Sequence, residues 1–127
     1  MAMGLTYSDL QLTNLFNGKT VRIRALVDTG ALHLCIPERV ATELGFDVTE
    51  VGTVRVTVAD NRRIEAPRVR PVQIDFSNRS TVMEAWVMGD EPLLGVIPIE
   101  AMDCIVDPTT QELRVNPAHP DFAVYRV

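Results

Sequence analysis

The chain has 127 residues and a formal net charge of −5, with 46% hydrophobic and 23% charged residues, a composition typical of a folded globular protein. The acidic balance argues against a nucleic-acid partner, because affinity for phosphate needs a basic surface. No stretch free of charged side chains exceeds nine residues, too few to span a bilayer, so no membrane partner is expected. The length predicts one domain over residues 1–127, too small for two lobes with a cleft between them.

The first predicted unit is a hairpin that leads into a group of polar residues. Val, Ile and Thr make up 35 of 127 residues, which favours strands. Tyr7–Leu15 predicts one strand, Asn17-Gly18 a two-residue turn and Thr20–Val27 the return strand. The return strand alternates apolar and Arg residues before it becomes continuously apolar, which indicates a strand entering the interior. It ends in Asp28-Thr29-Gly30.

The rest of the chain predicts short strands and two short helices. A proline at its start, an early acid and a closing glycine predict a helix over Pro37–Gly45, and Pro98–Met102 predicts one further helical turn. Further strands are predicted at Val54–Val58, from Arg63 onward, and at Val69–Phe76, Thr81–Met88, Leu93–Gly95, Cys104–Val106 and Leu113–Val115. The domain core spans about residues 4–115, and residues 116–127 form an irregular tail.

The cysteines and histidines predict neither a disulfide scaffold nor a metal site. Cys35 and Cys104 are too few for a disulfide framework, and both lie in apolar segments that favour structural thiols over nucleophiles. His33 and His119 are far apart and have no neighbours at ligand spacing, so no metal and no cofactor is expected. The N-terminus lacks the basic segment of a secretory signal, and we expect a cytoplasmic protein.

Asp28-Thr29-Gly30 is the first candidate for chemistry. A carboxylate at the end of a buried apolar strand is an unusual placement, because an isolated buried charge is costly. The threonine offers a hydroxyl, and the glycine lets the backbone turn with an amide close to the carboxylate. The same three residue types are also common in surface turns, so the tripeptide alone leaves a plain turn open.

A second segment, Leu93-Leu94-Gly95-Val96 with the helix and strand that follow, extends this pattern. Together with Ala25–Ala31 and a hairpin near Val54–Ile64, it resembles the retropepsin-like aspartic proteases, a group that includes retroviral proteases and small bacterial relatives. The resemblance covers roughly residues 4–115. It implies a mostly β acid-protease fold, with a closed barrel-like sheet, a flap hairpin and one or two short helices, and an endopeptidase that hydrolyses polypeptide substrates.

Hydrolysis of this kind needs two carboxylates that share one proton, with a water between them. The ionised carboxylate takes a proton from the water, and the protonated one polarises the scissile carbonyl. The chain holds a single Asp-Thr-Gly and no second Asp-(Thr/Ser)-Gly. A twofold axis would therefore place Asp28 opposite its own copy, and the resemblance implies a homodimer that is required for activity.

The resemblance assigns a role to the residues that flank Asp28. Thr29 matches the family's threonine, whose hydroxyl braces the two catalytic loops across the dimer axis. Gly30 and Ala31 match residues whose backbone lies beside the substrate and the carboxylates. Asp28, Thr29 and Gly30 are therefore expected to be catalytic, and Ala31 is expected to bind substrate.

Two further segments match the family by position. The hairpin tip Ala59-Asp60-Asn61-Arg62 is placed like the flap that closes over a bound peptide, although a plain exposed hairpin would look the same. Leu94-Gly95 matches the apolar-glycine pair that packs under the active-site loop. The retroviral members follow that glycine with arginine, whereas this chain has Val96, so any dimer salt bridge that needs the arginine is absent.

Two other functions stay open at this point. A retropepsin-like fold could serve as a peptide-binding or assembly module without turnover, because a dimer groove can bind extended chains by strand addition. An unrelated small β-barrel, with Asp28-Thr29-Gly30 as a turn, is the third reading.

Two smaller questions concern Trp86, which could belong to the core or to a pocket wall, and a group of arginines. The arginines are Arg62, Arg63, Arg68 and Arg70. They either form a solvent-exposed strand face or give a preference for acidic residues in the substrate.

Overall fold

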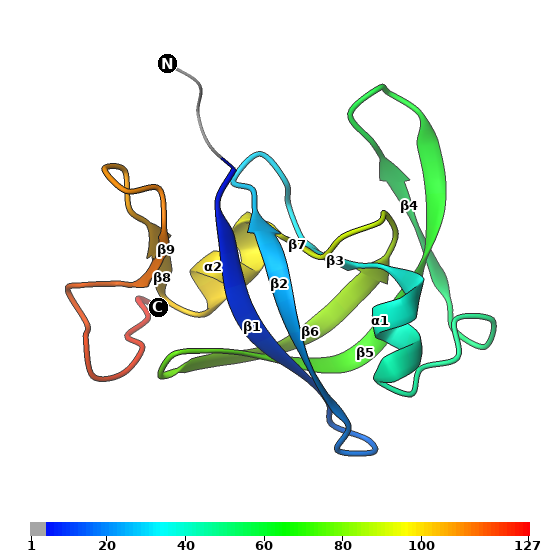
Figure 1. The fold of residues 1–127 in the computed structure, drawn as a ribbon, viewed down its shortest axis with the longest axis horizontal. Coiled ribbons are helices and arrows are strands. Elements are labelled where there is room, and N and C mark those ends of the chain that lie inside the picture. Colours follow the sequence, from blue (N-terminus) through cyan, green and yellow to red (C-terminus); the bar gives the residue numbers. More distant parts are fainter. Residues whose placement is uncertain (1–4) are drawn as a thin grey trace.

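The fold is built on one sheet that curves until its edges meet (Figure 1). The computed structural model describes residues 5–127, so the predicted start of the core at residue 4 lies just outside the described residues. Strands follow one another in the sheet in the order β1 (Tyr7–Asn14), β2 (Thr20–Val27), β7 (Leu93–Leu94), β3 (Leu34–Ile36), β6 (Arg79–Val87), β5 (Arg63–Phe76) and β4 (Thr53–Thr57). β1 also pairs with β5, which closes the ring and leaves β4 outside it. The expected mostly β, barrel-like fold is confirmed.

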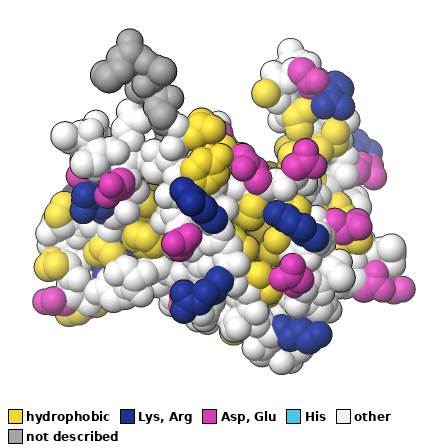
Figure 2. All heavy atoms as spheres, in the orientation of Figure 1, with side chains coloured by type: hydrophobic (Ala, Val, Ile, Leu, Met, Phe, Trp, Pro, Cys, Tyr) yellow, Lys and Arg dark blue, Asp and Glu magenta, His cyan; other side chains and the backbone are white. Residues whose placement is uncertain are grey.

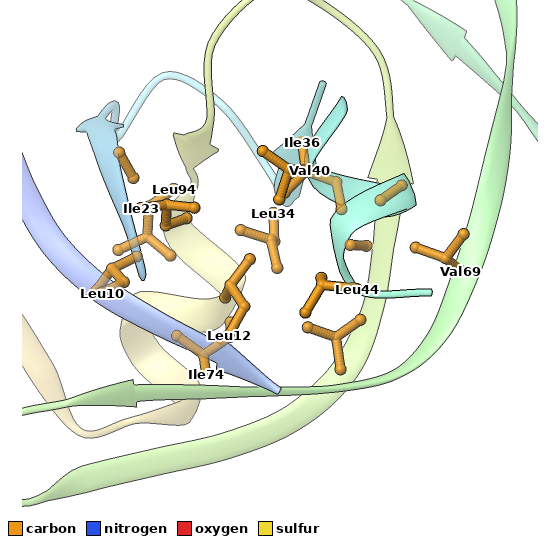
Figure 3. Close-up of a cluster of buried hydrophobic side chains, with 14 of the residues drawn as sticks. Leu10, Leu12, Ile23, Leu34, Ile36, Val40, Leu44, Val69, Ile74 and Leu94 are labelled. Carbon is orange, nitrogen blue, oxygen red and sulfur yellow. The ribbon is translucent and has the colours of Figure 1, made fainter. Parts of the chain in front are cut away.

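Alternating side chains of β1 and β2 supply one wall of the core (Figure 3). Leu10 and Leu12 of β1 and Ile23 of β2 are buried, whereas Arg22 and Arg24 on the other face of β2 are exposed. Figure 3 shows these side chains pointing toward others from β3, α1 and the residue that follows it, β5 and β7, which are Leu34, Ile36, Val40, Leu44, Val69, Ile74 and Leu94. The period of two in the sequence therefore reports which face of each strand lies inside the barrel.

The turn between β1 and β2 is fixed to the end of helix α1 (Glu38–Glu43). The Leu44 carbonyl accepts hydrogen bonds from Asn14 Nδ2 at 2.9 Å and from Asn17 Nδ2 at 3.1 Å. Gly45 follows with a φ of +84°, and a Cβ there would lie 2.5 Å from Asn17 Nδ2. The glycine that ends the predicted helix is thus needed for its backbone conformation and for the close approach of the turn.

β5 is longer than the sequence predicts. We expect separate strands from Arg63 and over Val69–Phe76, but the structure joins them into one strand of 14 residues. The pairing with β6 shifts between Val69 and Val72, where Pro71 has no N–H to donate to the ladder. The first half of β5 pairs with β4 in a projecting hairpin and the second half with β6 and β1 in the barrel.

The C-terminal third adds a helix, a small hairpin and a segment without regular structure. α2 (Val96–Ala101) begins two residues earlier than predicted, with Gly95 at the N-cap position. The predicted last hairpin is present as β8 (Cys104–Val106) and β9 (Leu113–Val115), and they pair antiparallel. None of the helices within residues 5–127 has the length and apolar character needed to cross a membrane.

The Asp103 carboxylate makes several of the hydrogen bonds that hold the segment after β9. Asp103 accepts hydrogen bonds from Asn116 Nδ2 at 3.0 Å, from His119 Nδ1 at 2.7 Å and from the Val124 amide at 3.0 Å. The buried Arg79 guanidinium adds a hydrogen bond to the His119 carbonyl. These contacts attach the C-terminal segment to the turn before β8 although it forms no strand.

We predict that this attachment weakens in acid. Hydrogen bonds from Val124, Asn116 and His119 lower the pKa of Asp103 from an ordinary 3.8 to about 2. A carboxyl group whose pKa is lowered by folding stabilises the folded state at pH values above its ordinary pKa. This stabilisation is lost as the pH falls toward the pKa that the group has in the folded protein. The contribution of Asp103 should thus be complete above about pH 4 and disappear toward about pH 2.

Urea unfolding of Asp103→Asn across a pH series measures this effect. The variant should unfold at lower urea than wild type at neutral pH, and the gap should shrink below about pH 4. Asp121→Asn is the matched control, because Asp121 is exposed and its part in holding the segment is a hydrogen bond that its backbone carbonyl accepts from Asn78. A gap that stays constant with pH would contradict the prediction.

Candidate active site

Asp28 lies where β2 leaves the barrel. Its amide donates to the Leu94 carbonyl at 3.0 Å, which continues the parallel pairing of β2 with β7 by one residue. The Gly30 amide donates to Asp28 Oδ1 at 2.9 Å, and a Cβ on Gly30 would lie 3.1 Å from that oxygen. Asp28 is half-buried and Thr29 is exposed. The tripeptide thus holds a carboxylate in a fixed orientation at the edge of the barrel.

The loop after Asp28 is bonded along its length to the start of α2. The Ala31 carbonyl accepts from the Val96 amide at 2.9 Å, the Leu32 carbonyl from Ile97 at 2.9 Å and the His33 carbonyl from Gly95 at 3.1 Å. Amides at a helix start have no acceptor within the helix, so the loop and the helix satisfy one another. This loop, residues 28–33, is called the Asp28 loop below.

Gly95 lets the Asp28 loop approach this closely. A Cβ at Gly95 would lie 2.5 Å from the His33 nitrogen, 2.6 Å from the Leu32 carbonyl carbon and 2.7 Å from the Ala31 oxygen. All three are backbone atoms, which cannot turn aside as a side chain can. The structure therefore places Leu94 and Gly95 directly against the loop that carries Asp28.

A groove with a volume of about 550 Å³ opens beside Asp28. It lies between the start of β1, the end of β2 and the β8–β9 turn, and its lining includes Leu5, Leu26, Val27, Thr29, Val106 and Pro108. Leu5 in this lining, and Leu32 and Ile97 where the Asp28 loop meets α2, are large apolar side chains that are exposed. The carboxylate is thus flanked by apolar surface that this chain leaves uncovered.

The β4–β5 hairpin projects from the barrel and is apolar on one face. Val54 pairs with Ala66 and Val56 with Ile64, whereas Arg55 and Glu65 share the opposite face. Figure 2 shows the hairpin standing clear of the body of the molecule, with apolar side chains along it, and in Figure 1 it rises on the same side of the barrel as the Asp28 loop.

The hairpin tip contains the four predicted substrate-binding residues Ala59, Asp60, Asn61 and Arg62. Asn61 has a φ of +66°, and Arg62 Nε lies 2.6 Å from Asp60 Oδ2. The tip is thus ordered by bonds within the turn, and the structure does not bring it into the hydrogen-bonded group formed by Asp28, Gly30, Ala31 and Gly95.

The structure brings together, next to the Asp28 loop, a group of polar and aromatic side chains whose association the sequence did not predict. The His33 ring stacks on Trp86 with centroids 4.1 Å apart, and His33 Nε2 lies 2.8 Å from the Glu84 carbonyl. The Glu84 carboxylate accepts from Trp86 Nε1 at 2.8 Å and from Arg68 at 2.8 and 2.9 Å. We name His33, Arg68, Arg70, Glu84 and Trp86 the Glu84 cluster.

Charge pairing dominates the Glu84 cluster. The hydrogen bonds from Arg68 hold the pKa of Glu84 below its ordinary value, and Arg70 Nη1 approaches the same carboxylate at 3.5 Å. The four arginines that are close in sequence do not form one surface: Arg62 pairs with Asp60 and Arg63 lies on the other face of β5. Trp86 is neither a core residue nor isolated, because it is half-buried in this cluster.

The two thiols are unsuited to nucleophilic chemistry. Burial raises the pKa of Cys35 and of Cys104 to about 11, so both stay protonated near neutral pH. Within residues 5–127, no three or more His, Cys, Asp and Glu side chains are grouped so that they could hold a metal ion. Around the Asp28 loop, the Asp28 carboxylate lines the open groove in an orientation fixed by the Gly30 amide, and the Asp107 carboxylate, held by the Thr109 and Thr110 amides, lines the same groove.

Comparisons with known proteins identify one family from the sequence and one fold from the structure. Residues 12–98 match the aspartyl protease family. The structure is similar to the retroviral protease-like domain of Ddi1 from Leishmania major, with a TM-score of 0.58 and 17% identity over 90% of this chain and 91% of that one. It is also similar to a retropepsin-like aspartic protease from Rickettsia conorii, with a TM-score of 0.51 and 21% identity over 84% and 91% of the two chains. No curated protein sequence matches significantly. The reading as an unrelated barrel is therefore wrong.

We predict that Gly95→Ala destabilises the fold by about 1–3 kcal/mol or more, because the new methyl group meets three backbone atoms of the Asp28 loop. Gly52→Ala is the control, since a Cβ there meets no atom within 4 Å and should change stability by less than about 0.5 kcal/mol. Urea unfolding of both variants measures the difference. Equal stability of the two variants would contradict the prediction, because it would mean that the Asp28 loop moves away from residue 95 without a loss of stability.

Proposed function

Because this chain belongs to the aspartyl protease family and has a retropepsin-like fold, we propose that it is an aspartic endopeptidase that acts as a homodimer. The observation that carries the proposal is a single Asp28 carboxylate, oriented by the Gly30 amide, at the mouth of an open groove. One domain over residues 1–127 supplies half of the active site. We place it in the cytoplasm, where its two free thiols stay reduced.

The second carboxylate would come from Asp28 of an identical subunit. The chain has one Asp-Thr-Gly, and peptide hydrolysis by this chemistry needs two carboxylates that hold one proton between them. The uncovered apolar side chains of Leu5, Leu32 and Ile97 lie around the same loop and favour a second subunit at this face. Exposed Thr29 then lies where its hydroxyl can brace the two loops.

Each group has a defined role in the proposed reaction. The ionised Asp28 takes a proton from the bound water while the water oxygen attacks the scissile carbonyl carbon. The protonated Asp28 stabilises the developing oxyanion. A carboxyl proton then passes to the leaving nitrogen, the C–N bond breaks, and the products are a carboxylic acid and an amine. Water is the only co-reactant.

The β4–β5 hairpin is proposed to act as the flap. Its apolar face, with Val54, Val56 and Ile64, can cover a peptide and exclude bulk water from the scissile bond. The tip, Ala59–Arg62, and the backbone of Ala31 are proposed to contact the substrate. Leu94 and Gly95 position the Asp28 loop and are not expected to touch the peptide.

We predict that Asp28→Asn lowers cleavage of an unstructured polypeptide by at least about a thousandfold, because the variant cannot accept the proton from water. The fold and the dimer should persist, as judged by circular dichroism and sedimentation. Asp9→Asn, on the exposed face of β1, is the control and should cleave like wild type. A wild-type protein that binds peptides without cutting them at any pH would instead be a binding module.

We further predict that inactive subunits suppress active ones. When wild type equilibrates with a roughly tenfold excess of Asp28→Asn, most wild-type subunits enter mixed dimers with one Asp28, and the cleavage rate should fall to roughly a tenth. The same excess of Asp9→Asn should raise the rate instead. If the Asp28→Asn subunits left the rate unchanged, a single chain would suffice for catalysis.

A further inference from the structure

One face of β5 connects the proposed flap to the Glu84 cluster. Side chains of a strand alternate between its faces, so Ile64, Ala66 and Arg68 share one face and Arg70 follows them. Ile64 and Ala66 pair with Val56 and Val54 and form the apolar face of the hairpin. The Arg68 amide also bonds to the Gly52 carbonyl at 2.8 Å, at the base of the hairpin. The arginines therefore continue the surface under which a peptide would lie.

The cluster carries more positive charge than its single carboxylate neutralises. Two guanidinium groups carry about ten N–H donors, and three of the hydrogen bonds in the cluster join them to Glu84. The Glu84 side chain is 17% exposed, and it also accepts from Trp86, so its oxygens are committed to the cluster. Arg70 is 69% exposed and its contact with Glu84, at 3.5 Å, is long. Its guanidinium is therefore available to a second anion.

The space beside Arg70 is suited to a small anionic group. Val51, Gly52, Arg68 and Arg70 line a hollow of about 260 Å³ at the base of the hairpin. Arg68 is fixed by two hydrogen bonds to Glu84, so the positive charge at this hollow is preorganised. A carboxylate fits the donor geometry of a guanidinium, whereas an uncharged amide gains no charge-assisted bond.

We propose that Arg70, beside Arg68 and Glu84, binds an acidic side chain of the peptide substrate at the base of the hairpin. This specificity rests on the proposed function, because it assumes that a peptide lies under the hairpin. Arg70 is six residues beyond Ile64, or roughly 20 Å along the strand, so the acidic residue lies several positions from the scissile bond.

Binding measured without cleavage tests this specificity. In an Asp28→Asn background, tryptophan-free peptides are titrated in pairs that differ by Glu against Gln at one position, scanned along the peptide. Trp86 is the single tryptophan and bonds to Glu84, so its emission reports occupancy of the cluster. At one position the Glu peptide should bind about fivefold tighter at low salt, as expected for a partly exposed ion pair.

Charge variants identify the residue responsible. Arg70→Gln should remove the preference for Glu, and Arg70→Glu should reverse it toward a Lys peptide. Arg55→Glu is the matched control, because Arg55 is 82% exposed on the opposite face of the hairpin and should keep the preference. Equal binding of Glu and Gln peptides at every position, a preference that survives Arg70→Gln, or no peptide binding would overturn the proposal.

The two proposals fail in different ways. A wild-type protein that cleaves Glu and Gln peptides equally, with Asp28→Asn inactive, would remove the acidic specificity and keep the protease. Selective binding of Glu peptides without cleavage by wild type would remove the protease and keep the acidic site.

Discussion

The attachment of the Asp28 loop to α2 is the constraint on which the site depends. Three consecutive loop carbonyls, from Ala31 to His33, accept from three consecutive amides that begin at Gly95. The bonds satisfy groups that would be orphaned at a helix start, and they are possible because Gly95 has no Cβ. The carboxylate of Asp28 thereby acquires a fixed position although the loop forms no regular structure.

The ordered Asp28 carboxylate makes the small size of the domain compatible with the proposed catalysis. The Asp28 carboxylate is held by its own loop and by pairing with β7, so it needs no second lobe to orient it. The apolar side chains around the loop are left for another surface to cover. In the proposed dimer, symmetry supplies the missing carboxylate and also buries these side chains, and the cleft lies between two copies rather than within one.

β5 links the proposed flap to the barrel. Its second half is tied into the barrel by β1 and β6, while its first half extends with β4 into a hairpin that has few other contacts. The Glu84 cluster lies where the pairing of β5 changes from β4 to β6. Through Glu84 and Trp86 it connects Arg68 to His33 at the end of the Asp28 loop. The proposed flap and the proposed acidic site are therefore joined through the same strand.

Local pattern was enough to predict the hairpin of β1 and β2, the short helices, the last hairpin and the family, because alternation, Asn-Gly, Gly45 and Asp-Thr-Gly act over a few neighbouring residues. Side-chain clusters were not predictable in this way. His33, Arg68 and Glu84 come from a loop and two strands, and no spacing in the chain relates them. The amino-acid sequence was therefore sufficient to predict most of the strands and the position of the carboxylate, but not β3 or the continuity of β5. Only the folded structure shows which backbone atoms orient that carboxylate and which side chains assemble into the Glu84 cluster. Both depend on the register of the strands and on the closure of the sheet.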